Sequence, residues 1–411
     1  MIPVVLSQHA EEAAFQWLLR DLAVHEPHYD LKDLAKLDDR VEAHLDGLRI
    51  AGDPGWEICK EELAWEEAGE VFAAASLAFG SDKPELISEV LEAVGQSTDL
   101  ARGAISALGW MPYDRARSQL ENLLKAEDPI RQRIAIGASA VHREDPGLAL
   151  TSAVATDDSI VRSRALKAAG ELGRTDLLGS CPANFEAEDE PSRIWAAWSA
   201  ALLGHHPSAY RLAEIAVEGG TRAEMVCDLA TRRMTPAEAL GWHGQLVSEG
   251  SHLRLAATAA RALGDSTLVP WLFEIMESDE LARPAGEAFS IITGLDLAYE
   301  DLEGEWPEGF EAGPTEAPED EDVAMDPDED LPWPDLELVR GWWAENGGRF
   351  SAGTRYLRGE PISEASLMDV LKFGKQRERA AAALELALLG PDQPLFEVRA
   401  RGDVQRRLLG G

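Results

Sequence analysis

The sequence predicts an all-α protein that folds as an α-solenoid, a superhelix in which helix pairs stack one on the next. Three observations predict this class. A short pattern with one arginine recurs seven times along the chain, with a period of about 30 residues that is typical of repeat architectures. Each copy carries Ala and Leu at helical spacing, and several copies close near a glycine. No convincing strand pattern appears anywhere in the sequence.

Residues 1–64 are predicted to form N-terminal capping helices. The stretch "AEEAAFQWLLRDLAVH" places Trp17 and its apolar neighbours on one helical stripe. Pro27 is expected to end this helix because proline lacks the backbone N–H that the helix needs. Asp30 is expected to cap a second helix, whose apolar positions run from Leu31 to Leu48.

Residues 65–302 are predicted to form the repeat array. One arginine marks each copy: Arg102, Arg131, Arg162, Arg193, Arg222, Arg254 and Arg283. An aspartate precedes five of them by three or four residues: Asp99, Asp128, Asp158, Asp189 and Asp279. Aspartate at such a position accepts hydrogen bonds from the free N–H groups of a helix start. We interpret the row as a structural stack that pairs Asp with Arg between repeats, and a ligand-binding ladder of arginines is the alternative.

A unit of about 30 residues cannot bury its own apolar face, so neighbouring units must supply the core. Small alanines at the repeated positions allow neighbouring helices to approach closely. With these features the pattern resembles HEAT-like repeats, and the resemblance covers roughly residues 65–295. This resemblance implies an architecture and leaves the activity open.

Residues 303–335 are predicted to be an acidic linker rich in Pro and Gly. The segment holds 14 acidic residues and no basic residue, and it shows no apolar period. We favour a free linker, and expect that deleting residues 305–330 leaves the thermal melt almost unchanged. The alternative is that the segment lies over a basic patch, for which the arginines between residues 376 and 407 are candidates.

Residues 336–411 are predicted to form a C-terminal helical unit. Its aromatic residues and one arginine are candidate partner contacts, because both residue types are common interface anchors. They are Trp342, Trp343, Phe350, Arg355 and Tyr356. Of these, Arg355 is the better candidate for a specific contact, since its guanidinium can hold a carboxylate. For the aromatic residues we favour the alternative that they fill the core where the solenoid ends.

The net charge of −37 excludes several classes of partner. A surface this acidic repels phosphate backbones and anionic lipids, so we expect neither nucleic acid nor membrane as a partner. Mimicry of nucleic acid toward a basic protein is an alternative, and solubility is the simpler reason for the charge. The three cysteines lack CxxC spacing, and the chain shows neither a signal peptide nor an apolar span. These features predict a cytoplasmic protein.

The sequence shows no motif that carries catalysis, so we predict no catalytic residue, cofactor or metal ion. Neither a P-loop, a dinucleotide-binding glycine motif nor a nucleophile elbow is present. Residues 25–47 hold three histidines and five aspartates. A metal site within residues 21–39 is a minor alternative, because His44 lacks a ligand at helical spacing and Pro27 separates the other two histidines. Cys59 is interpreted as a small buried residue.

Several phrases together resemble an uncharacterised bacterial family of HEAT-like repeat proteins. They are "QHAEEAAFQWLLRDLAV", "PHYDLKDLAKLDDRVEAHLDGLRIAG", "ITGLDL", "DPDEDLPWPD", the "WW" pair and "FSAGTRYLRGEPI". The resemblance extends from residue 8 to about residue 388. Members of that family are often encoded beside the type VI secretion spike proteins VgrG and PAAR and their effectors. The resemblance therefore implies a genomic context, and it assigns no catalytic residue.

Taken together, these features predict a non-enzymatic scaffold or adaptor that binds another protein. The resemblance implies that this partner is a type VI effector, a VgrG or PAAR spike component, or a co-encoded accessory protein. One alternative is an immunity protein that neutralises a co-encoded toxin. Another is an enzyme with a site in the concave groove, which predicts polar residues with perturbed pKa values gathered in one pocket.

Overall fold

The protein is predominantly α-helical, as predicted. The computed structural model describes residues 3–81, 83–310, 312–313 and 325–410. The described chain folds as two compact units. Unit 1 comprises residues 1–205, 372–377 and 386–411, and unit 2 comprises residues 206–371 and 378–385. The predicted boundaries after residues 64, 302 and 335 concern a different division of the chain and stay predictions.

Unit 1 consists of short helices joined by tight connections. Its elements are α1 (Pro3–Ala23), α2 (Leu31–Ala51), α3 (Asp53–Glu62), η1 (Leu63–Trp65), α4 (Ala68–Ser81), α5 (Pro84–Val94), α6 (Leu100–Trp110), α7 (Tyr113–Leu124), α8 (Pro129–His142), α9 (Leu148–Ala153), α10 (Ser159–Glu171), η2 (Thr175–Ser180), η3 (Pro182–Asn184), α11 (Glu190–Leu202) and α21 (Gly402–Leu408).

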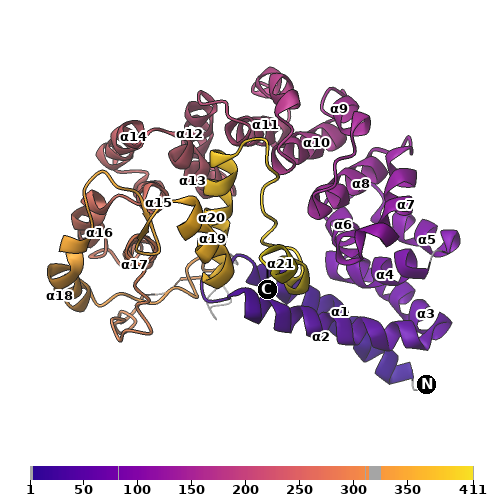
Figure 1. Ribbon diagram of the computed structural model, residues 1–411. Coiled ribbons are helices and arrows are strands. Elements are labelled where there is room, and N and C mark those ends of the chain that lie inside the picture. The colour runs from indigo at the N-terminus through magenta and orange to yellow at the C-terminus, as the bar shows by residue number, and fades with distance from the viewer. Residues whose placement is uncertain (1–2, 82, 311, 314–324, 411) are drawn as a thin grey trace. The chain divides into compact units, whose positions relative to one another are not determined.

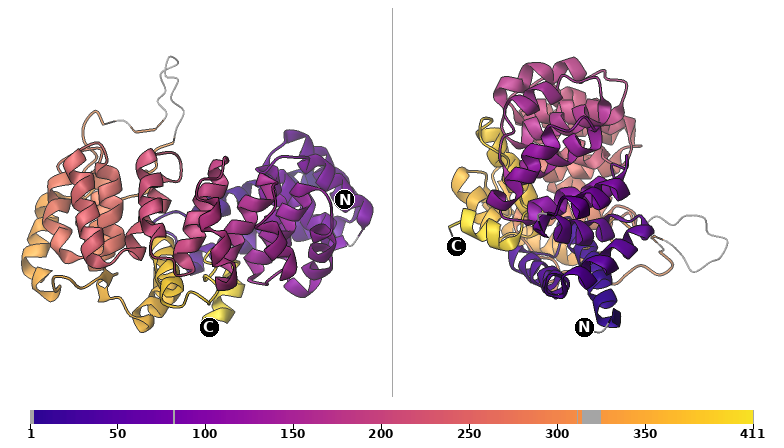
Figure 2. Two further views of the ribbon diagram at one scale, coloured as in Figure 1. Left: turned by 90° about the horizontal axis from the view of Figure 1, so that it is seen from above. Right: turned by 90° about the vertical axis from the view of Figure 1, so that its right-hand side faces the viewer.

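The helices of unit 1 pack in a regular order. Helix α1 lies against α2 and α4, and α4 packs on α6, α6 on α8, α8 on α10, and α10 on α11 (Figure 1). Figure 2 shows this row, in purple and magenta, from two further sides. The buried faces are rich in alanine, and Ala74, Ala104 and Ala138 have no exposed surface. Small side chains at these positions let neighbouring helices approach closely, as the sequence predicts.

Glycine allows the closest approach in this row. A Cβ atom added to Gly103 on α6 would lie 2.2 Å from the backbone oxygen of Ala68 and 2.9 Å from the backbone nitrogen of Phe72, both on α4. No side chain fits at such distances. The glycine that follows the first repeat arginine therefore sets the spacing between α4 and α6.

The predicted helix starts are confirmed at four aspartates. Asp30 forms a capping box with Asp33 at the start of α2. Asp128, Asp158 and Asp189 each accept a hydrogen bond from a backbone N–H at the starts of α8, α10 and α11, as expected for N-caps.

The same prediction is wrong at two aspartates. Asp99 stands before α6, but its side chain makes no capping hydrogen bond. Asp279 lies outside its helix, because α17 begins only at Ala282. The spacing between aspartate and arginine is the same at both kinds of site, so spacing alone does not identify a cap.

Unit 2 continues with helices and contains the only strands among the described residues. Its elements are α12 (Ser208–Glu218), α13 (Ala223–Arg233), α14 (Pro236–Glu249), α15 (Leu253–Leu263), η4 (Ser266–Leu268), α16 (Val269–Ile275), α17 (Ala282–Thr293), α18 (Leu336–Asn346), η5 (Gly347–Arg349), β1 (Tyr356–Leu357), β2 (Glu360–Pro361) and most of α19 (Glu364–Phe373). Residues 378–385 of α20 (Gln376–Leu389) also belong to it.

The β1–β2 hairpin is a feature that the sequence analysis missed. Its strands pair Tyr356 with Pro361 and Leu357 with Glu360 in antiparallel register. The backbone N–H of Tyr356 also donates to the carbonyl oxygen of Gly264, at the end of α15, at 2.9 Å. From the sequence alone, this stretch is interpreted as a turn-rich connection. Each strand has only two residues, which are too few for an alternating pattern of apolar and polar residues to show.

A buried histidine in unit 2 gives the protein a predicted sensitivity to acid. The ring of His243 on α14 meets Trp271 edge-on, with 4.4 Å between ring centroids, and only 5% of the residue is exposed. Burial lowers the pKa of His243 from 6.5 to about 4. The His243 ring therefore takes up a proton more readily in the unfolded chain than in the folded protein. The contribution of His243 to stability is retained above pH 6.5 and lost as the pH falls toward 4.

Between pH 7 and pH 4.5, His243 is expected to lower the free energy of unfolding by about 2 kcal/mol. The variant His243→Leu removes the titrating group, so its loss of stability between the two pH values should be smaller than that of the wild type by this amount. Urea denaturation at both pH values measures the difference. An unchanged pH dependence in the variant would contradict the prediction.

Among the described residues, no helix is both long enough and apolar enough to cross a membrane.

Candidate functional site

The repeat arginines do not form one regular stack. Among the described members of the predicted set, one pair joins neighbouring repeats, Arg162 with Asp189 at 2.6 Å. Arg131 pairs with Asp128 of its own repeat at 3.4 Å. Of the Asp–Arg pairs that were predicted between repeats, the described residues therefore show the pair of Arg162 with Asp189.

The other repeat arginines of unit 1 have different partners. Arg102 pairs with Asp21 on α1 and lies 3.9 Å from Asp99. Arg193 donates to the backbone oxygens of two residues just before its helix, at 2.8 and 2.9 Å. These contacts hold the arginines in place, which favours a structural function over the alternative of a ligand-binding ladder.

In unit 2 the repeat arginines hold the acidic segment. Arg254 binds both carboxylate oxygens of Asp328 at 2.7 Å and pairs with Glu224 at 2.5 Å. Arg283 pairs with Asp326 at 2.7 Å and donates to the backbone oxygen of Asp328 at 2.8 Å. Arg222 stands just before α13.

The aromatic residues of the acidic segment also gather around Arg283. Its guanidinium carbon lies 4.7 Å from the ring centroid of Trp306, 5.5 Å from that of Trp333 and 5.7 Å from that of Phe310. The three rings contact one another edge-on or tilted. Only 2% of Arg283 is exposed, so the cation is enclosed by the aromatic rings, the Asp326 carboxylate and the Asp328 backbone oxygen.

These contacts correct the expectation of a free linker. The described parts of residues 303–335 are docked on unit 2, where Arg254 and Arg283 of the repeat array bind them. The alternative that arginines between residues 376 and 407 receive the segment stays a prediction. Residues 311 and 314–324 of the predicted linker lie outside the described residues.

The five candidate partner contacts are engaged within unit 2. Trp342 and Trp343 pack edge-on against Phe289, Trp343 stacks on Phe350, and Phe350 packs against Tyr356. Arg355 donates to Glu385 and to the backbone oxygens of two residues at the end of α15. The core interpretation therefore describes these residues better, and we do not retain them as partner contacts.

The histidine-rich stretch gives one pair that sequence spacing missed. His9 on α1 and His44 on α2 lie with their Nδ1 atoms 3.1 Å apart. A Cβ atom on Gly47 would come within 2.9 Å of the His9 ring, so this glycine makes room for the pair. The two histidines are 35 residues apart, a separation at which helical spacing gives no signal.

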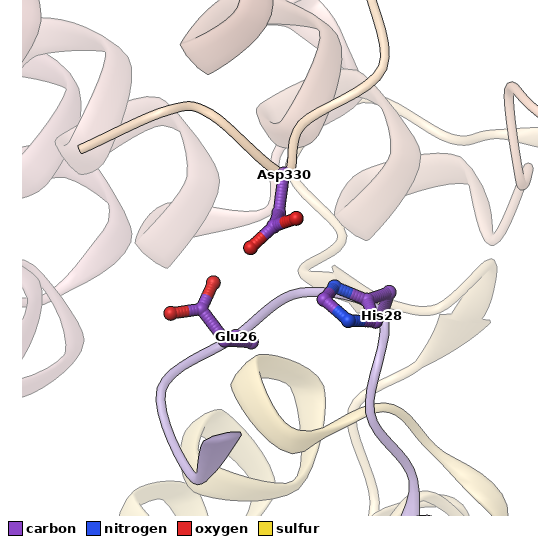
Figure 3. Close-up of side chains that lie close together, drawn as sticks. All are labelled: Glu26, His28 and Asp330. Atoms are coloured by element: carbon purple, nitrogen blue, oxygen red, sulfur yellow. The ribbon is translucent and has the colours of Figure 1, made fainter. Parts of the chain in front are cut away.

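Glu26 and His28 lie on the connection between α1 and α2 (Figure 3). Asp330, drawn with them, belongs to unit 2. We assign no metal site to residues from two separate units.

The three cysteines are buried and free. Burial raises the pKa of Cys59 and of Cys181 to about 12, and it raises the pKa of Cys227 as well. Thiols in this state are protonated and poorly nucleophilic. The interpretation of Cys59 as a small buried residue agrees with these surroundings.

A cluster with perturbed pKa values lies on α10. Burial lowers the pKa of Lys167 to about 8, and its ammonium nitrogen lies 4.3 Å from the ring centroid of Trp195. Burial alone would raise the pKa of Glu171, but the charges of Arg164 and Lys167 outweigh it and lower this pKa to about 2. Arg164 binds Glu171 at 2.8 Å, the geometry of a structural ion pair.

Unit 1 also contains a cavity of about 500 Å³, a size typical of ligand sites. It lies among α2, α3, α4 and α6, with the start of α7 and Arg401 at its edge. Its apolar wall includes Trp56, Trp110, Leu48 and Leu77, which are all buried. None of the residues of the Lys167 cluster lines it, so the cavity and these perturbed groups lie in different places.

Most charged groups at this cavity are paired with one another. Glu42 accepts from Arg49 and from the indole Nε1 of Trp110, both at 2.6 Å. Burial opposes ionisation of Glu42, but these hydrogen bonds outweigh it and lower its pKa. Arg401 lies over the Trp110 ring at 5.2 Å, and Lys83 pairs with Asp53 at 3.0 Å.

A second surface feature lies on α1. Five large apolar side chains of this helix are exposed to between 37% and 75%, namely Val4, Val5, Phe15, Leu19 and Leu22. From Val4 to Phe15, Leu19 and Leu22 the spacings of eleven, four and three residues are close to whole helical turns, so these four share one face of the helix. Trp17 and the alanines of the opposite face are buried against the rest of unit 1.

Comparisons with protein-family models, with curated proteins and with solved structures give no match. The functional assignment therefore depends on the residues of this chain.

Proposed function

We propose that this protein is a non-enzymatic scaffold or adaptor that binds a partner protein through the exposed apolar face of α1. The observation that carries the proposal is the stripe formed by Phe15, Leu19 and Leu22 at positions i, i+4 and i+7. This is the spacing with which an amphipathic helix enters the apolar groove of a partner. Contiguous apolar side chains on a surface mark interaction sites, whereas single ones are ordinary.

The negative charge of the chain indicates the chemistry of the proposed partner. The chain carries a net charge of −37, and Glu11 is exposed on α1 beside the stripe. A field of this sign speeds the encounter with a basic protein and disfavours acidic ones. The proposed partner therefore has an apolar groove with a basic rim.

A HEAT-like solenoid is the architecture we propose for the repeat array. The successive packing of α4, α6, α8 and α10 supports it, as does the recurrence of the arginine pattern. Under the family resemblance, the partner is a type VI effector, a VgrG or PAAR spike component, or a co-encoded accessory protein. An adaptor of this kind binds both cargo and spike.

Affinity capture from the native host, followed by mass spectrometry, tests the proposal. The double variant Phe15→Asp/Leu19→Asp is compared with Leu148→Asp, which alters a single apolar side chain that is 84% exposed on α9. Because two central anchors each contribute about 2 kcal/mol or more, recovery of a secretion component or effector should fall by at least tenfold with the double variant only.

Three outcomes decide the proposal. Equal recovery with the wild type and the double variant would exclude the α1 face as the binding surface. Recovery of abundant metabolic proteins alone would count against an adaptor function. Capture of an effector without any spike component, together with rescue of cells from that effector, would replace the adaptor by the immunity alternative.

A further inference from the structure

Among the residues that the structure describes, one arginine that lines the cavity of unit 1 has no carboxylate partner. Among the described residues, Arg115 on α7 donates to the backbone oxygen of Gly80 at 3.1 Å, and no carboxylate lies within ion-pair distance of it. The other cations at this cavity are each close to an acidic group, as Arg49 is to Asp46 at 2.9 Å. In a chain with 75 acidic and 38 basic residues, a cation at a cavity edge that pairs with no acid of the described residues points to an anionic ligand.

A buried hydroxyl inside the same cavity provides an independent observation. Ser76 on α4 is only 3% exposed, and its Oγ has no hydrogen-bond partner among the described residues. A buried polar atom without a partner costs about 1–3 kcal/mol, so native proteins rarely leave one unsatisfied. A ligand atom that bonds to Ser76 removes this cost.

The apolar side chains that line the cavity indicate the chemistry of the rest of the ligand. Trp56 and Trp110 supply aromatic surface, and Leu48 and Leu77 supply aliphatic surface. A flat apolar group fits such a wall, because aromatic side chains give large contact area and favour stacked or edge-on neighbours. The cavity volume of about 500 Å³ leaves room for one aromatic group with its attached acid.

We propose that this cavity binds an aromatic or aliphatic group that bears a carboxylate, with the carboxylate on Arg115 and a second polar atom of the ligand on Ser76. The carboxyl-terminal apolar residue of a peptide has this chemistry, and so does a free arylalkyl carboxylic acid. The site is separate from the α1 face, so the proposal stands whether or not the scaffold function is correct.

Isothermal titration calorimetry with three probes tests the site on the full-length chain. The probes are 3-phenylpropionate, the peptide acetyl-Gly-Gly-Phe and the carboxamide of the same peptide. Binding of at least one acid, and at least tenfold weaker binding of the carboxamide, is the expected result, because a hydrogen-bonded charge pair contributes about 1.5–3 kcal/mol. Binding of the peptide acid alone identifies a peptide terminus as the ligand, and binding of 3-phenylpropionate alone identifies a small acid.

Variants of one helix provide the matched control. Arg115→Gln is expected to weaken the acid at least tenfold, and Ser76→Ala severalfold. Arg117→Gln, two residues away on α7, removes an exposed arginine that pairs with Glu121 at 3.0 Å outside the cavity, and should leave affinity unchanged. Arg115 is exposed, so its substitution should not disturb folding, which circular dichroism verifies. The proposal is overturned if neither acid binds at millimolar concentration, if the carboxamide binds equally well, or if Arg115→Gln binds like the wild type.

Discussion

Replacing Arg283 by alanine is expected to lower the free energy of unfolding by about 3–5 kcal/mol. The substitution leaves the Asp326 carboxylate without its partner in a site where its side chain is 7% exposed. It also leaves a space among Trp306, Phe310 and Trp333, which surround the guanidinium. Burial alone would raise the pKa of Asp326, and the hydrogen bond from Arg283 lowers it, so the charged form depends on this arginine.

Urea denaturation followed by tryptophan fluorescence measures this loss. Arg340→Ala is the matched control, because Arg340 pairs with Glu277 at 2.9 Å while both side chains are exposed, and such pairs contribute about 1 kcal/mol or less. Deleting residues 305–330 should destabilise the protein in the same direction as Arg283→Ala, since it removes Trp306, Phe310, Asp326 and Asp328. A melt that the deletion leaves unchanged would show that the docked segment contributes little.

Replacing Glu385 by alanine is expected to cost a similar amount, about 3–5 kcal/mol. Glu385 on α20 is 3% exposed. It binds Arg232 of α13 at 2.8 Å and Arg355 at 3.2 Å. Without Glu385, Arg232 keeps only Asp228, which it binds at 2.7 Å, and Arg355 keeps only backbone oxygens. The charges of the two arginines are then only partly neutralised. The variant also loses the ion pairs that connect α20 to α13 and to Arg355.

Two further variants test this interpretation of Glu385. Glu385→Gln keeps the shape of the side chain and can still accept hydrogen bonds. Its free energy of unfolding should therefore lie between those of the wild type and the alanine variant. Glu364→Ala, at the exposed start of α19, should change stability by no more than about 0.5 kcal/mol. Equal stabilities of Glu385→Ala and Glu364→Ala would mean that the buried charges are satisfied in another way.

The all-α class and several helix starts were predictable because they depend on local chemistry. Asp30, Asp128, Asp158 and Asp189 cap helices with hydrogen bonds that span two or three residues, so their signal lies within a short stretch of sequence. The alanine positions of the repeats are buried for a related reason, since one helical period predicts which face packs.

The partners of the charged residues were not predictable in this way. Arg283 meets Asp326 across 43 residues, and Arg232 meets Glu385 across 153. An acidic, proline-rich segment reads as a linker because composition reports only on the average residue. Its docking depends on a few residues, among them Trp306 and Asp328, at positions that composition does not resolve. The cavity is likewise formed by α2, α3, α4 and α6 together, so no single stretch of sequence predicts it.

The docking of Asp326 and Asp328 has a consequence for what unit 2 can bind. These carboxylates are tethered to the array whose arginines they occupy, so they act as an internal competitor with an effective concentration in the millimolar range. A free acidic ligand must exceed that concentration to displace them from Arg254 and Arg283. Below that concentration, self-occupancy keeps free acidic molecules away from Arg254 and Arg283.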